Sequence, residues 1–589
     1  MRRFLVGLFA TIGIVTLLLV VGGGVAFWKF AESRPNLPGT IVLDADFTHS
    51  LADGAGKDRL SRLAFGNTQT LRDVVDTLDR AAADPRVKGL YARLGNDALG
   101  LATCQQLRDA ISNFRAKGKF AIAFSDSFGE FGPGTRPYYL ATAFDDIWLQ
   151  PLGSVGLIGL QAQTPFLRGA LDKLGILPSF AERKEYKTAM NVFTKTAMTP
   201  PQREEIRSLL SSSAGQIVRG IAAGRHLPTP QVAALMDRGP FLADEAKKAG
   251  LVDDIGYRDE AIARARQRAG KGARLVSLSR YLEGAGRPHD SGPKIALIYG
   301  TGLITADSDR LGTLTGTAEL SARKVARALR QASSDRNVRA ILFRIDSPGG
   351  SAVASETLWR EVVRARERGK PVIVSMGSVA GSGGYYIAAP ADKIVAEPAT
   401  LTGSIGVLAG KFVIADLLHK LGITDESAQL GANATMFSAF EDFSPSAHER
   451  LDAFLDATYR GFKAHVAAGR HLTAAQVEAV AKGRVWSGED AKANGLVDAL
   501  GGYDVALRLA KEAAKIGADK PVRLVVFPRK KGAFEQIYDR LTDSEGDGEG
   551  ATLAMPRGIA GGVAGVLSAI ETLMRDPGVL QMPPVGEIR

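Results

Sequence analysis

Residues 384–398 read GYYIAAPADKIVAEP, and a related stretch, PYYLATAFDDIWLQP, lies 247 residues earlier at 137–151. Both contain a tyrosine pair, a small apolar segment, an aspartate and a closing proline at matching positions. Further pairs show a similar spacing: AAGRHL at 222–227 and 467–472, and DPRVKGLYARL at 84–94 with DRNVRAILFRI at 335–345. Repetition at a nearly constant spacing indicates two copies of one domain. We place the copies at residues 40–286 and 293–528.

Within each copy, short β-branched runs alternate with helical stretches. In the second copy KIALIYG (294–300), RAILFRID (339–346) and PVIVSMG (371–377) have the composition of buried strands. SETLWREVVRARERG (355–369) has the apolar spacing of an amphipathic helix and ends on glycine. Strand, helix and strand joined by short connections predict an α/β fold with largely buried strands.

Composition narrows the classes of function. The chain has 589 residues, 45% of them hydrophobic and 23% charged, which is enough for two or three domains with real cores. Cys104 is the only cysteine, so neither an intramolecular disulfide nor a thiolate metal site can form. The net charge of +11 is spread along the chain, which favours a mildly basic surface facing anionic lipid over a nucleic-acid groove.

The N-terminus has the pattern of a membrane anchor. Residues 4–28 contain no charged side chain and follow two arginines, and the run is long enough to span a bilayer as a helix. A cleaved signal peptide is the competing interpretation, because Gly24-Val25-Ala26 offers a small-x-small cleavage pattern. The length of the apolar run favours a retained anchor, which we place at residues 1–30. Lys29 and Arg34 roughly balance Arg2 and Arg3, so the positive-inside bias is weak and leaves the orientation open.

Residues 529–589 form a linker and tail of different composition. They include an acidic, glycine-rich stretch, DSEGDGEG at 543–550, and a short apolar helix candidate at 557–574. The sequence does not show whether this tail docks on the body, on a neighbour or on a membrane.

The two copies differ in the residues that could carry chemistry. The paired glycines Gly349 and Gly350, the glycine-flanked Ser382 and Ser404 all occur only in the second copy. Lys187, in contrast, has no lysine counterpart there. Each copy thus lacks what the other keeps, which indicates one composite site.

Ser382 needs a base, because a serine hydroxyl is a weak nucleophile on its own. None of the seven histidines has a glycine-rich catalytic context, and His226 and His471 belong to the duplicated AAGRHL, where helix termination explains them. Lysine can replace histidine when burial lowers its pKa. Taken singly, Ser382 and Ser404 fit turn residues and Lys187 fits a solvated surface lysine. Their complementary distribution favours a serine and lysine pair.

Four motifs together resemble the signal peptide peptidase A family, also called protease IV, in its long, duplicated form. They are SPGGS (347–351), SVAGSGGYYIA (378–388), LTGSIGV (401–407) and EYKTAM (185–190). The resemblance implies a crotonase-like, Clp-protease-like α/β fold in each copy, behind an N-terminal transmembrane helix. It implies Ser382 as nucleophile, Lys187 as general base and Ser404 as the residue that orients the lysine.

The resemblance also implies a membrane-bound endopeptidase that degrades remnant signal peptides as a homo-oligomer such as a tetramer, without metal or cofactor. Its soluble body would lie on the periplasmic side of the inner membrane. Backbone amides of Gly349, Gly350 and Gly383 would form the oxyanion hole. Two alternatives remain open: a crotonase-like acyl-thioester enzyme, in which the glycine amides polarise a thioester, and an inactive membrane scaffold.

Overall fold

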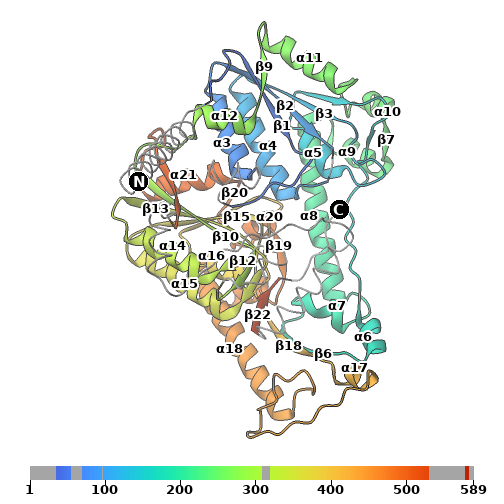
Figure 1. The fold of residues 1–589 in the computed structure, drawn as a ribbon, viewed down its shortest axis with the longest axis vertical. Coiled ribbons are helices and arrows are strands. Elements are labelled where there is room, and N and C mark those ends of the chain that lie inside the picture. Colours follow the sequence, from blue (N-terminus) through green and yellow to red (C-terminus); the bar gives the residue numbers. More distant parts are fainter. Residues whose placement is uncertain (1–34, 55–68, 96, 308–318, 529–577, 583–589) are drawn as a thin grey trace, which may run out of the picture.

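The computed structural model describes residues 35–54, 69–95, 97–307, 319–528 and 578–582 (Figure 1). The predicted anchor and the helix candidate at 557–574 lie outside the described residues. Among the residues that are described, no helix is both long and apolar enough to cross a membrane.

The first copy is built on a parallel sheet in the order β8-β4-β3-β2-β1-β9. Its strands are buried because helices cover the sheet, as parallel sheets require. The strands are β1 (Ile41–Asp46), β2 (Val87–Leu94), β3 (Phe120–Ser125), β4 (Asp146–Leu149), β8 (Asp254–Ile255) and β9 (Arg274–Ser277). A two-stranded ribbon adds β5 (Ser154–Val155) and β7 (Phe241–Leu242).

The second copy repeats this order as β20-β16-β15-β13-β10-β21, with β17 and β19 continuing from β15. Its strands are β10 (Lys294–Thr301), β13 (Val338–Ser347), β15 (Val372–Gly381), β16 (Lys393–Ala396), β17 (Leu401–Gly403), β19 (Val485–Ser487), β20 (Ala499–Leu500) and β21 (Arg523–Phe527). The strands predicted at 294–300, 339–346 and 371–377 are confirmed. The α/β fold is confirmed as well.

Among the described residues, most helices of one copy also have a counterpart in the other. Those of the first are α3 (Leu71–Ala82), α4 (Leu101–Ala116), α5 (Thr135–Ala141), α6 (Arg168–Leu174), α7 (Asn191–Thr194), α8 (Pro200–Arg225), α9 (Thr229–Arg238), α10 (Ala243–Lys248), α11 (Arg258–Ala269) and α12 (Leu278–Ala285). Those of the second are α14 (Ala322–Ser334), α15 (Ala352–Glu367), α16 (Gly383–Ala388), α17 (Ala415–Lys420), α18 (Pro445–Arg470), α19 (Ala474–Val480), α20 (Gly488–Ala493) and α21 (Tyr503–Ala513). The helix predicted at 355–369 is α15.

The long helices α8 and α18 show how the duplicated motif shapes the backbone. Each has 26 residues and proline in its first turn, and each ends at a histidine, His226 or His471, whose φ is 54°. A left-handed residue directly after a helix is a standard way to stop it. The prediction that these histidines terminate helices is confirmed.

A third sheet contains strands of both copies and runs β12-β11-β14-β22-β18-β6. The strands are β6 (Leu177–Arg183), β11 (Leu303–Thr305), β12 (Glu319–Ser321), β14 (Gly349–Ser351), β18 (Val407–Val413) and β22 (Gly578–Gln581). Strand β6 of the first copy pairs antiparallel with β18 of the second over seven residue pairs. This pairing places a strand of the first copy directly beside a strand of the second.

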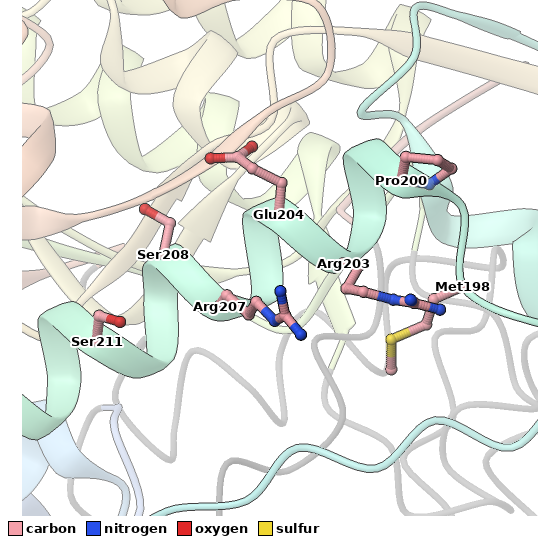
Figure 2. Close-up of a pocket in the computed structure, with 7 residues that line it drawn as sticks. All are labelled: Met198, Pro200, Arg203, Glu204, Arg207, Ser208 and Ser211. Atoms are coloured by element: carbon pink, nitrogen blue, oxygen red, sulfur yellow. The ribbon is translucent and has the colours of Figure 1, made fainter.

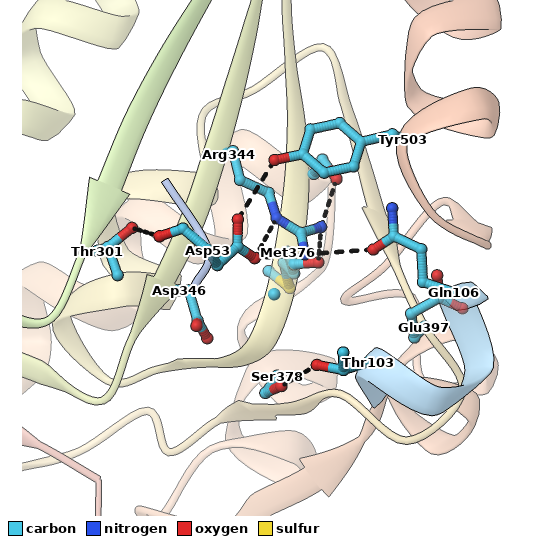
Figure 3. Close-up of polar contacts among 12 residues, drawn as sticks. Asp53, Thr103, Gln106, Thr301, Arg344, Asp346, Met376, Ser378, Glu397 and Tyr503 are labelled. Carbon is cyan, nitrogen blue, oxygen red and sulfur yellow. Dashed lines mark hydrogen bonds and ion pairs between the residues drawn. The ribbon is translucent and has the colours of Figure 1, made fainter. Parts of the chain in front are cut away.

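A buried polar cluster joins the copies from another side (Figure 3). The guanidinium of Arg344, on β13, donates to the Asp53 carboxylate at 2.6 and 2.8 Å and to the backbone oxygen of Met376 at 2.6 Å. It also lies over the ring of Tyr503, 4.7 Å from the ring centroid. Asp53 lies between β1 and α3 of the first copy, so this ion pair holds the two copies in a fixed relation.

Candidate active site

Ser382 stands at a sharp turn between β15 and α16. Its φ of 52° is unusual for a residue with a side chain, and such strained turns concentrate at functional sites. Its backbone N–H donates to the Gly403 oxygen at 2.8 Å, which fixes the turn against β17. The side chain is fully buried.

Lys187 reaches this serine from the other copy. It follows β6 by four residues, and the backbone N–H of Tyr186 donates to the Lys482 oxygen at 3.1 Å. A Cβ added to the neighbouring Gly483 would lie 2.5 Å from the Lys187 nitrogen, so only glycine leaves space for this approach. The loop at residues 482–483 of the second copy therefore holds Lys187 of the first copy in place, within one chain.

The lysine amine contacts both serines that the sequence singled out. Lys187 Nζ lies 2.7 Å from Ser382 Oγ, 2.9 Å from Ser404 Oγ and 3.0 Å from the Ser404 carbonyl oxygen. A neutral amine has two N–H donors and one lone pair. The three contacts fit an ammonium that donates to all three oxygens, and they equally fit a neutral amine that donates both N–H groups to Ser404 and accepts the Ser382 hydroxyl with its lone pair.

Burial decides the charge state of this amine. Lys187 is 1% exposed. Desolvation lowers its pKa well below the usual 10.5, while the nearby Glu205 carboxyl acts in the opposite direction. The alternative of a solvated surface lysine therefore does not describe Lys187, whereas it does describe Lys184, whose side chain is 51% exposed.

Glu205, on α8, is a member of the site that sequence reasoning missed. Its Oε1 accepts the backbone N–H of Val485 at 2.6 Å, and it is buried. Burial raises the pKa of Glu205 to about 8. The carboxyl is therefore mostly protonated at neutral pH and attracts the lysine ammonium only weakly.

The three glycines lie beside the nucleophile but in different settings. Gly383 opens α16, so its amide has no acceptor within the helix. A Cβ on Gly383 would lie 3.3 Å from the Gly349 Cα, which places the two glycines side by side. The Gly349 amide donates to Ser347 Oγ at 3.2 Å, and Gly350 is paired with Ile304 and Leu580 in the third sheet.

A cavity lies along the first half of α8. It is an open cavity of about 450 Å³ (Figure 2). It is lined by Met198, Pro200, Arg203, Glu204, Arg207, Ser208 and Ser211. None of the predicted site residues lines it.

Comparison with known proteins agrees with the motifs. The model of peptidase family S49 matches residues 132–271 and 364–517. The chain is 32% identical over 488 residues to the chloroplastic serine protease SPPA of Arabidopsis thaliana, covering 82% of this chain and 71% of the relative. It is 30% identical over 527 residues to Protease 4 of Salmonella typhi, covering 86% of this chain and 82% of the relative.

Solved structures add little to this assignment. A mutant of ClpP1 from Listeria monocytogenes matches 36% of this chain and 94% of its own, with 16% identity and a TM-score of 0.24. That score is too low to bear on the fold. The sequence relationships suffice, because they extend over most of both chains: the chain belongs to peptidase family S49 and is a serine protease.

Proposed function

We propose that Ser382 and Lys187 form a catalytic dyad in which Ser382 is the nucleophile, Lys187 the general base and Ser404 the residue that orients the amine. The observation that carries this proposal is the 2.7 Å contact between Lys187 Nζ and Ser382 Oγ inside a buried pocket. Lys187 and Ser382 come from different copies, so nearness in the sequence does not explain their contact.

The geometry supports a two-step hydrolysis. Neutral Lys187 takes the proton of the Ser382 hydroxyl while the serine oxygen attacks the peptide carbonyl carbon. The resulting ammonium returns the proton to the leaving amine, and an acyl-enzyme remains. Water then attacks the acyl carbon and gives a proton to the same amine. As the bond to the serine oxygen breaks, the ammonium passes this proton to Ser382 Oγ, which releases the acid and restores the hydroxyl and the neutral amine. Ser404 keeps the amine aimed at Ser382 in both steps.

The oxyanion requires donors beside the attacked carbonyl. The Gly383 amide is available at the start of α16. Gly349 lies beside Gly383, and its amide donates to Ser347 Oγ, so it becomes available when that hydrogen bond opens. Gly350 is held by Ile304 on β11, so it serves to hold the glycine turn in place. We therefore assign the oxyanion hole mainly to Gly383 and Gly349.

Replacing Glu205 with glutamine tests how the pocket sets the charge of Lys187. The amide can still accept from Val485 but can no longer ionise. Because the ionised carboxylate raises the lysine pKa, its removal is expected to move the rising limb of kcat/KM to lower pH. The shift should be below about one pH unit, since Glu205 is mostly protonated below its pKa of about 8.

The matched control is Glu204→Gln, one residue away, where the side chain is 51% exposed and pairs with Arg484. Its pH profile should equal that of the unchanged enzyme. A rising limb displaced to higher pH in Glu205→Gln would contradict the assigned role of the carboxyl.

Remnant signal peptides are the proposed substrates. The motifs resemble those of signal peptide peptidase A, and the uncharged run at residues 4–28 would hold the enzyme where such fragments collect. We place the body on the periplasmic side of the inner membrane, with Clp-protease-like copies assembled into a homo-oligomer such as a tetramer. Tethering raises the local concentration of membrane-bound fragments.

Substrate preference distinguishes this proposal from its alternatives. The purified enzyme in detergent is expected to cleave a synthetic signal peptide at least ten times faster than a polar peptide of equal length, because the proposed substrates are apolar. The full-length chain should sediment with membranes and retain residues 1–30. Turnover of acyl-CoA without peptide hydrolysis would instead support an acyl-thioester enzyme, and no turnover of either would support a scaffold.

A further inference from the structure

Strand β15 is irregular just before it reaches the nucleophile. It pairs in parallel with β13, and Ile345 lies opposite Met376 in this pairing. The next pair joins Ser347 to Ala380, so β13 advances by two residues while β15 advances by four. Extra residues in one strand form a β-bulge, which leaves backbone groups without ladder partners and changes the direction of the strand. The bulge therefore sets where β15 delivers Ser382.

The side chain of Asp346, on β13, lies at this bulge (Figure 3). Its Oδ1 accepts the backbone N–H of Val379 at 2.9 Å, and the backbone N–H of Ser378 forms a second hydrogen bond to the carboxyl. Burial, together with the nearby Asp53, raises the pKa of Asp346 to about 6, so the group is mostly ionised at neutral pH and acts only as an acceptor. Both donors are backbone groups, so the contacts do not depend on the side chains at 378 and 379.

Gly377 leaves the space that this carboxylate needs. A Cβ at Gly377 would lie 2.6 Å from Asp346 Cγ and 2.7 Å from its Oδ1. A larger residue at 377 would push the carboxylate away from the N–H groups that it binds. The acid and the glycine therefore depend on each other.

The first copy contains the same two residue types with their places exchanged. A spacing of 251 relates β2 and β3 to β13 and β15, and at this spacing Gly95 corresponds to Asp346 and Asp126 to Gly377. The Asp126 carboxylate accepts from the guanidinium of Arg93, on the neighbouring strand, at 2.5 Å. In the first copy the acid thus serves as the partner of an arginine.

The corresponding arginine of the second copy has a different partner. Arg344 forms its ion pair with Asp53 of the first copy at 2.6 Å. The carboxylate of Asp346 is thereby left for the backbone N–H groups of the bulge. This use of the acid occurs in the copy that contains Ser382, which points to a role in its chemistry.

The register of β15 against β13 matters because these strands lead to the two sides of the oxyanion hole. Strand β13 continues through Ser347 to Gly349, and β15 continues through Ser382 to Gly383. A Cβ on Gly383 would lie 3.3 Å from Gly349 Cα, so the two segments are already in close contact. A small displacement of β15 would change the distance between the two amides and the reacting carbonyl.

We propose that Asp346 is a positioning residue for the hydrolysis, because its carboxylate fixes β15 so that Ser382 and the Gly349 and Gly383 amides meet one substrate carbonyl. The inference rests on the proposed dyad and oxyanion hole. Asp346 acts through the strand and does not touch the substrate. Since the oxyanion exists only after attack, the loss of this carboxylate should lower kcat and leave KM nearly unchanged.

Substitutions of Asp346 test this role by steady-state kinetics on a hydrophobic peptide. Asp346→Asn keeps the shape of the side chain but has only one acceptor oxygen, so kcat is expected to fall about tenfold while KM stays within about twofold. Asp346→Ala binds neither N–H group, and its kcat should fall about 100-fold, as for a catalytic group displaced by about 1 Å. Asp126→Asn, at the exchanged position of the first copy, is the matched control and should keep kcat within about twofold.

Two inhibitors separate positioning from a general loss of structure. With a peptide aldehyde, Ser382 Oγ bonds to the aldehyde carbon, the serine proton passes to Lys187, and the carbonyl oxygen becomes an oxyanion. The inhibition constant of the aldehyde should rise in Asp346→Asn by the factor by which kcat/KM falls. The same peptide ending in an alcohol forms no oxyanion, and its inhibition constant should stay unchanged. Thermal unfolding of each variant measures stability separately.

The outcomes distinguish this inference from the dyad on which it rests. Native kcat in both Asp346 variants would overturn the inference, and so would an equal rise of both inhibition constants, which is the sign of a merely structural role. If Asp346→Ala did not fold, the two inhibitors compared in Asp346→Asn would decide. Near-native hydrolysis by Ser382→Ala would instead contradict the proposed dyad.

Discussion

Peptide hydrolysis is expected to fall by about 10⁴-fold or more when Ser382 is replaced by alanine, because no other group takes over a covalent step. The fold should survive, since alanine keeps the Cβ at this strained turn and removes only the hydroxyl that contacts Lys187. Initial rates on a hydrophobic peptide, together with circular dichroism and thermal unfolding of the variant, measure both statements.

Ser378→Ala is the matched control. This serine lies on the same strand, four residues earlier, and its hydroxyl is 3.4 Å from that of Thr103, on the side of the polar cluster (Figure 3). Its loss should leave the rate within about twofold, as is usual for a position away from the chemistry. If Ser382→Ala kept more than a tenth of the native rate, Ser382 would be a packing residue.

Replacing Lys187 with arginine is expected to lower kcat by about 10³-fold or more. A guanidinium keeps its proton at any working pH, so it cannot accept the serine proton. Lys187→Met has neither a base nor a buried charge and should be equally inactive, which separates the loss of the base from the cost of burying a larger cation. Both variants are compared by their kcat on the same peptide.

Lys184→Ala is the control for this second result, because Lys184 is three residues away and pairs only loosely with Glu478 at 3.8 Å. An exposed pair of this kind contributes little, so activity should stay within about twofold. A Lys187→Arg enzyme that retained a tenth of native activity would place the base elsewhere, and the two copies would not need each other for chemistry.

The duplication made much of this architecture predictable. Two related copies predict two related sheets, and the unequal distribution of Lys187 and Ser382 predicts that the copies meet at one site. The structure brings these two residues and Ser404 together. The crossing of β6 into the second copy was not predicted, because strand pairing between distant segments leaves no local periodicity in the sequence.

Other parts of the site had no readable signal. Glu205 stands in an ordinary helical stretch, and its burial depends on the contact with Val485 from the other copy. Strand β22 has only four residues within a tail of different composition, and four residues are too few for a strand pattern to stand out. In both cases tertiary contacts decide the environment, and the local sequence does not contain them.

The central claim is tested most directly by the pH dependence of Ser382 labelling with a fluorophosphonate probe, which reacts covalently with an activated serine. The labelling rate reports the protonation state of the base and does not depend on peptide binding or product release. If neutral Lys187 activates Ser382, the labelling rate should rise with pH through a single ionisation well below 10.5, and Lys187→Met should abolish that rise. A labelling rate whose rise stays unchanged in Lys187→Met would show that another group activates the serine.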